Sequence, residues 1–208
     1  MRIESVSANP DRVGRYYVKF EDGSTLRLYR QTVEDYAIYA GREMDDAELS
    51  RLHTDAGKMS AKMRATRILA ATDVSKRDLQ QRLVQKGEDP QQAAEAVAWL
   101  EELNLVDDER TAGIIVRRCA AKGYGIARAK QALYEKRIPK EYWDAALEDY
   151  PDQSQVIEAQ LRKCDPNDPK QVKKTVDALI RRGHSYSQIK KTMNNLLMED
   201  GFSEDYDG

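Results

Sequence analysis

The residues able to catalyse a reaction or to hold a metal are few in this sequence, and their spacing favours no active site. Two histidines are present, His53 and His184, and neither stands at metal-ligand spacing from a cysteine or a carboxylate. Gly123-Tyr124-Gly125 has two glycines but lacks the lysine and the preceding strand of a phosphate-binding loop. The acidic run 107–109 is typical of a helix cap and first turn, where the helix dipole favours carboxylates. We therefore predict a protein that is not an enzyme, with no catalytic residues, metal or cofactor.

Charge is the more informative chemical feature, because its sign alternates along the chain. Residues 110–140, the first basic zone, hold nine bases and one acid, and residues 170–191, the second basic zone, hold seven bases and one acid. Residues 88–109 and 141–158 hold acids and no base, and a third acidic segment starts at Glu199. Basic zones with few local acids are typical of surfaces that bind an anion, either a phosphate backbone or an acidic protein face.

The candidate contact residues for a partner or for DNA are cations of these two zones. They are Arg117, Arg118, Lys122, Arg128, Lys130, Arg137, Lys173, Lys174, Arg181, Arg182, Lys190 and Lys191. For Arg182, at the end of a predicted helix, simple compensation of the helix dipole is an equal alternative. Tyr124 has two interpretations as well, since a loop tyrosine can stack on a base or pack back on its own unit.

The composition indicates a charged cytoplasmic protein. The chain has 208 residues, of which 40% are hydrophobic and 34% charged, against roughly 25% charged in a typical globular domain. The first residues lack the pattern of a secretion signal, and no apolar run is long enough to span a membrane. The two cysteines, Cys119 and Cys164, are expected to be reduced. We expect a cytoplasmic monomer without membrane contact.

The spacing of apolar residues predicts one hairpin followed by helices. Residues 15–30 alternate around an Asp-Gly turn, which predicts a β-hairpin, and residues 47–71 have the period of a helix. Beyond them Leu83, Leu133 and Leu179 each close a short amphipathic helix that ends in a cation. The anchors are 50 and 46 residues apart, which indicates an internal repeat of the size found in helical arrays.

Capping residues mark the ends of these helices. Ser75 and Asp89-Pro90 are typical of helix starts, and Gly87 and Gly183 suit the left-handed position after a helix. The predicted fold is mainly α, with three tandem three-helix units preceded by a small N-terminal β-hairpin and helix. The expected domains are a hairpin and helix extension (1–60), repeat 1 (61–106), repeat 2 (107–150), repeat 3 (151–198) and an acidic tail (199–208).

Four segments of the helical region carry distinctive combinations of residues: 105–112 (LVDDERTA), 122–126 (KGYGI), 133–138 (LYEKRI) and 181–189 (RRGHSYSQI). Together they closely resemble the RecX family of bacterial recombination regulators, over about residues 62–198. Thr111 and His184 depart from the family, which usually has an aromatic residue, commonly Phe, at these positions. The departures concern local packing.

The resemblance implies a curved array of three-helix units that binds RecA and the RecA filament on single-stranded DNA. It further implies that the chain inhibits filament assembly, ATP hydrolysis by RecA and strand exchange, and thereby modulates recombination, DNA repair and the SOS response. An extended repeat array suits this partner, because it presents one long surface to a filament groove. Direct contact with DNA is left open.

The alternative is an autonomous DNA-binding protein, because a three-helix unit can imitate a helix-turn-helix. The predicted helices 91–103 and 140–150 are acidic, which argues against a recognition helix in the first two units. The last unit, with Lys190, Lys191 and Asn194, retains that interpretation.

Overall fold

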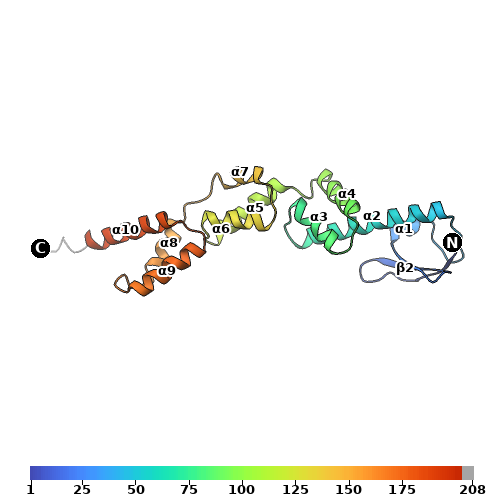
Figure 1. Ribbon diagram of the computed structural model, residues 1–208, viewed down its shortest axis with the longest axis horizontal. Helices are drawn as coiled ribbons and strands as arrows, with labels where there is room; N and C mark the ends of the chain where they lie inside the picture. The colour runs from blue at the N-terminus through green and yellow to red at the C-terminus, as the bar shows by residue number, and fades with distance from the viewer. Residues whose placement is uncertain (203–208) are drawn as a thin grey trace. The chain divides into compact units, whose positions relative to one another are not determined.

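The computed structural model describes residues 1–202, with side chains described to residue 198 (Figure 1). A small β-sheet head is followed by helices in three groups of three, which confirms the predicted mainly α fold with tandem three-helix units. The chain divides between Val106 and Asp107 into two compact units, called here the N-terminal unit and the C-terminal unit. Residues 203–208 of the predicted acidic tail lie outside the described residues.

The head is a three-stranded antiparallel sheet in the order β1 (Ile3–Val6), β2 (Arg15–Phe20) and β3 (Thr25–Tyr29). The predicted hairpin is β2–β3, and its turn places Gly23 at φ +85°, in the left-handed region that favours glycine. Strand β1 was not predicted. Its four residues contain one fully buried side chain, Ile3, so its apolar pattern is too short to be recognised.

Two helices follow the sheet, α1 (Arg30–Asp35) and the long α2 (Asp46–Ala71). Asp45 caps α2, because its carboxylate accepts a hydrogen bond from the Glu48 amide at 2.7 Å. The first half of α2 packs Leu52 and Ala56 against the apolar face of the sheet, and the second half packs Ala61 and Ala65 into the first helical group. Helix α2 continues without a break through residues 60 and 61, so the head and the first group share it.

The first helical group is completed by α3 (Lys76–Gln85) and α4 (Pro90–Glu102). The predicted caps are confirmed: the Ser75 hydroxyl accepts from the Asp78 amide at 3.1 Å, and Asp89 caps α4 with proline at its first position. Gly87 closes α3 at φ +89°. Leu83, Ala93, Leu100 and Val106 lie in the core of this group.

The second group consists of α5 (Asp108–Ala121), α6 (Ile126–Glu135), the 3₁₀ turn η1 (Lys140–Tyr142) and α7 (Trp143–Leu147). The helix expected over 140–150 is shorter in the structure. Tyr150 precedes a proline, which disfavours helical backbone there. The side chains that pack together in the buried core of this group include Ala112, Ile115, Cys119, Ala129 and Leu133.

The third group consists of α8 (Ser154–Leu161), α9 (Pro169–Arg181) and α10 (Tyr186–Phe202). Ile157, Leu161, Leu179 and Ile189 form its buried core. Helix α10 continues past residue 198 into the segment predicted as a tail.

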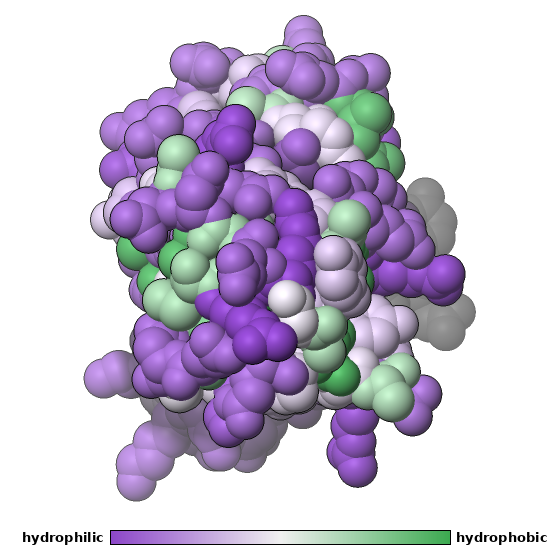
Figure 2. All heavy atoms as spheres, turned by 90° about the vertical axis from the view of Figure 1, so that its right-hand side faces the viewer, coloured by the Kyte–Doolittle hydropathy of each residue, from purple (hydrophilic) through white to green (hydrophobic). Residues whose placement is uncertain are grey.

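The three anchors of the predicted repeat are all buried, since Leu83 and Leu133 are 0% exposed and Leu179 is 1% exposed. The face drawn in Figure 2 is mostly hydrophilic, with smaller apolar areas between the charged side chains. Within the described residues, no helix is both long and apolar enough to cross a membrane.

Candidate partner-binding surface

The two histidines and the acidic run 107–109 lie on different elements of the structure. Within the described part of the chain, no three His, Cys, Asp or Glu side chains are placed to hold a metal ion. His53 is exposed on α2, whereas His184 is 4% exposed in the C-terminal unit. Asp107 caps α5 as predicted, with its carboxylate accepting from the Arg110 amide at 3.0 Å. The acidic run 107–109 therefore begins a helix.

The first basic zone places exposed cations along α5 and α6. Arg117, Arg118 and Lys122 are exposed at the C-terminal end of α5, where the helix dipole favours cations, and Lys130 is exposed on α6. Arg117 lies back along its own helix, so that a Cβ added at Gly113 would lie 3.0 Å from its Nη1.

Two further cations of this zone lie on or directly after α6. Arg128 is partly buried and pairs with Glu135, with Nη1 and Oε1 3.1 Å apart. This half-exposed pair contributes little to stability. Arg137 is exposed and closes α6 at φ +56°, where the equivalent positions of the other groups are Gly87 and Gly183.

The second basic zone has its exposed cations on α9 and α10. Lys173 and Lys174 lie on the first half of α9, Arg181 at its last residue, and Lys190 and Lys191 near the start of α10. Together with the first zone, ten of the twelve predicted contact residues are exposed, and Arg128 and Arg182 are only partly exposed.

Arg182 contacts the second helical group from the third. Its Nη2 donates to the carbonyl of Lys122 at 2.8 Å, and its guanidinium lies 5.4 Å from the centre of the Tyr124 ring. The Tyr150 hydroxyl donates to the carbonyl of Tyr124 at 2.6 Å. The Tyr124 side chain packs against the core of the second group, as one of its two interpretations predicted, and the Arg182 guanidinium lies over its ring. Arg182 thus forms part of the contact between the second and third groups, which is called the joint below.

The same joint contains a close approach of two backbones. The Gly125 amide donates to the Arg182 carbonyl at 2.9 Å, and the Ala127 amide donates to the Gly183 carbonyl at 3.2 Å. A Cβ at Gly125 would lie 2.0 Å from the Gly183 oxygen, a distance that real Cβ atoms do not show. Glycine at this position thus permits the second and third groups to hydrogen-bond directly. No sequence pattern indicated this joint, although both glycines belong to segments that carry the family resemblance.

His184 lies beside this joint with its side chain buried. Burial lowers the pKa of His184 below its ordinary value of 6.5, against a hydrogen bond to the Gly123 carbonyl that raises the pKa, and the charge of Arg182 lowers the pKa further. Its Nε2 is buried without a hydrogen-bond partner within the described residues. These contacts favour a neutral imidazole that packs beside the joint.

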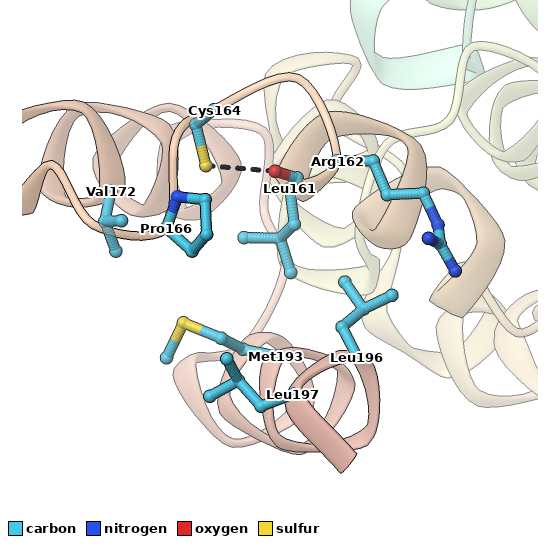
Figure 3. A pocket seen from close by; sticks show the side chains of 8 residues that line it. All are labelled: Leu161, Arg162, Cys164, Pro166, Val172, Met193, Leu196 and Leu197. Carbon is cyan, nitrogen blue, oxygen red and sulfur yellow. Dashed lines mark hydrogen bonds between the residues drawn. The ribbon is translucent and has the colours of Figure 1, made fainter. Parts of the chain in front are cut away.

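An apolar pocket of about 420 Å³ lies in the third group (Figure 3). Its lining includes Leu161, Met193, Leu196 and Leu197, and Cys164, whose Sγ donates to the Leu161 carbonyl at 3.0 Å. The volume suits a small apolar ligand or side chain. Apart from this thiol and the guanidinium of Arg162, the side chains that line the pocket are apolar, so it favours packing over catalysis.

Comparison with known proteins connects this architecture with one family. Residues 107–147 match the family model described as RecX, second three-helix domain. The chain is 31% identical over 157 residues to the regulatory protein RecX of Chlorobaculum tepidum, a match that covers 73% of this chain and 98% of that relative. It is 29% identical over 136 residues to the regulatory protein RecX of Vibrio campbellii, covering 63% of this chain and 88% of that relative.

Two solved structures share the fold. A crystal structure of regulatory protein RecX matches with a TM-score of 0.63 at 18% identity, over 93% of this chain and 98% of that one. The crystal structure of RecX from Lactobacillus salivarius matches with a TM-score of 0.59 at 19% identity, over 68% of this chain and 97% of that one.

Proposed function

Because the chain belongs to the RecX family of regulatory proteins, we propose that it binds RecA and the RecA filament on single-stranded DNA and restrains filament assembly, ATP hydrolysis and strand exchange. Through this contact it modulates recombination and DNA repair, and RecA, not this chain, hydrolyses ATP. The observation that carries the proposal is the match to a regulatory relative over 98% of that relative's length.

The proposed contact surface consists of the ten exposed cations of the two basic zones. They are Arg117, Arg118, Lys122, Lys130, Arg137, Lys173, Lys174, Arg181, Lys190 and Lys191. Arg182 is left out of this surface, because its guanidinium is used in the joint between the second and third groups. Arg128 is left out because it pairs with Glu135.

A filament on DNA offers two kinds of anion to such a surface, namely DNA phosphates and the carboxylates of the protein. Long exposed lysine and arginine side chains can reach either one. The two differ in their response to salt, since each phosphate contact on a single strand changes the slope of log affinity against log salt by roughly 0.7. Contacts to carboxylates lack this per-phosphate dependence.

Direct DNA recognition by the third group is the second candidate function. Lys190, Lys191, Asn194 and Asn195 are all exposed on α10, which follows a short turn after α9. Asparagine and lysine are residue types that bind base edges in the major groove. Helix α4, in contrast, carries acids and no base, so the first group lacks a comparable recognition helix.

The proposal is tested by adding the purified chain to RecA filaments preformed on single-stranded DNA and measuring both ATP hydrolysis and co-sedimentation. We expect the chain to sediment with the filament and to lower hydrolysis. Unchanged hydrolysis at a saturating, co-sedimenting concentration would contradict the proposed inhibition. Binding of duplex DNA in the absence of RecA, with sequence preference and without an effect on the filament, would favour the second candidate.

A further inference from the structure

A further concentration of positive charge lies in the N-terminal unit, whereas both basic zones belong to the C-terminal unit. A pocket of about 450 Å³ is lined by five cations and by no carboxylate. The five are Arg15, Arg64, Arg67, Arg82 and Lys86. None of them is a candidate residue for filament contact, so this pocket is a separate feature of the molecule.

Three elements bring these cations together. Helix α2 forms the floor, because Arg64, Arg67 and Ile68 stand at helical spacing on one face. Arg82 and Lys86 are four residues apart at the end of α3, and Arg15 is the first residue of β2. The Arg67 Nη2 donates to the Tyr29 hydroxyl of β3 at 2.9 Å, which fixes the floor against the sheet.

Three of the cations have carboxylate partners that do not line the pocket. Arg15 pairs with Asp11 at 2.8 Å and Arg82 pairs with Asp78 at 2.9 Å. Arg64 Nε lies 2.6 Å from Glu88 Oε1, although the angle between them is not that of a hydrogen bond. Each pair orients a guanidinium while it leaves the interior of the pocket positive.

The remaining two cations have no ion pair with any carboxylate among the described side chains. Arg67 uses two of its nitrogens on neutral oxygens, the Tyr29 hydroxyl and the Met63 carbonyl. The Lys86 side chain is exposed, and the hydrogen bonds that Lys86 forms with other described residues come from its backbone. Five cations against three carboxylates give this cluster an excess of two positive charges.

We propose that this pocket is a binding site for a phosphate group. Forked guanidinium donors match the several oxygens of a phosphate, and an excess of two positive charges compensates one phosphate dianion or two phosphodiesters. The pocket is larger than a single phosphate ion, so it suits a phosphate carried by a larger molecule. Two sources share this chemistry, namely the free phosphates of a nucleotide and the backbone of a nucleic-acid strand.

The test uses the full chain without RecA, so its outcome is independent of the proposed inhibition. Pyrophosphate binding is measured by titration calorimetry, and binding of a fluorescent single-stranded oligothymidylate is measured by anisotropy at several salt concentrations. The pocket variant is Arg67→Gln with Lys86→Gln. The matched control is Arg51→Gln with Arg77→Gln, which removes one exposed cation from α2 and one from α3, both outside the pocket lining.

The pocket variant is expected to weaken binding by about tenfold or more, because each interaction that it removes is a charge-assisted hydrogen bond. The control variant is expected to bind like the parent. If the pocket binds a nucleic-acid strand, the slope of log affinity against log salt for the oligonucleotide should fall by roughly 0.7 for each phosphate that the variant no longer neutralises. If the pocket binds the free phosphates of a nucleotide, only pyrophosphate binding should be weaker in the pocket variant.

Circular dichroism checks that the variants fold, and Lys86→Gln alone serves if Arg67→Gln disturbs the contact with Tyr29. Because the Lys86 side chain has no described partner, its removal leaves the packing intact, and a loss of about threefold or more is still expected. The proposal is overturned if the parent binds neither probe, or if the pocket variant and the control lose affinity equally.

Discussion

The joint between the second and third helical groups can be tested by comparing the effects of alanine substitution at Gly183, which lies in the joint, and at Gly87, which does not. Gly87 and Gly183 both follow a helix that is closed by a leucine anchor, and their φ angles are +89° and +88°. An added Cβ at Gly87 meets nothing within 4 Å, whereas at Gly183 it would lie 2.3 Å from the Arg128 amide nitrogen. Alanine at either position would therefore carry the same backbone strain, but only Gly183→Ala would also clash with the backbone of Arg128.

The expected magnitudes follow from this difference. Gly87→Ala costs roughly 1 to 2 kcal/mol of unfolding free energy, the penalty for a left-handed residue with a Cβ. Gly183→Ala carries the same penalty, and the clash also separates the turn after α9 from the start of α6. Two backbone hydrogen bonds are then broken, from Gly125 to Arg182 and from Ala127 to Gly183, at about 1 kcal/mol each. The expected cost of Gly183→Ala is therefore about 3 to 4 kcal/mol.

Native-state hydrogen exchange measures the joint directly, because the two donors are the amides of Gly125 and Ala127. A weakening by about 2 kcal/mol should speed their exchange roughly thirtyfold in Gly183→Ala. Gly87→Ala lies in the other unit and should leave these two amides unchanged. If Gly183→Ala costs no more stability than Gly87→Ala and exchange at the joint is unaltered, the close backbone approach is refuted.

Three further predictions concern the C-terminal unit. Leu133→Ala should cost about 2 to 5 kcal/mol in urea denaturation, because the side chain is 0% exposed, and a cost below about 0.5 kcal/mol would contradict its burial. Burial lowers the pKa of His184 in the folded state, so its contribution to stability is complete above pH 6.5 and is lost as the pH falls through the lowered pKa of the folded state. His184→Phe should remove this pH dependence of the unfolding free energy, and an unaltered pH profile would refute the buried, neutral state of His184. Replacing Arg117, Arg118 and Lys122 by Ala should weaken filament co-sedimentation and leave the fold intact, since all three are exposed; a folded variant that inhibits RecA like the parent would exclude this part of the surface.

The helical repeat could be predicted because its signals are local. Each anchor leucine, with its helix spacing and the capping residues around it, lies within a few residues of the structure that it specifies. The position after the second anchor helix shows where this signal weakens. Arg137 adopts the left-handed conformation at φ +56°, although it is not a glycine, so only the alignment with Gly87 and Gly183 indicated the helix end.

The joint and the basic pocket could not be predicted in the same way, because they depend on contacts between distant residues. Arg182 and the Lys122 carbonyl that it binds are 60 residues apart. The pocket combines Arg15 of the head with Lys86, the residue that follows α3. Residues 56–87 hold eight bases and two acids, but nothing in the sequence indicates that four of these bases line one pocket with the distant Arg15.

Helix α2 has a consequence for how the N-terminal unit unfolds. Its first half supplies Leu52 and Ala56 to the core of the head, and its second half supplies Ala61 and Ala65 to the core of the first group. A helix propagates cooperatively, so melting in one half weakens the next turns of the other half. The head and the first group are therefore expected to open as one cooperative folding unit, and a truncation at residue 61 would cut through that unit.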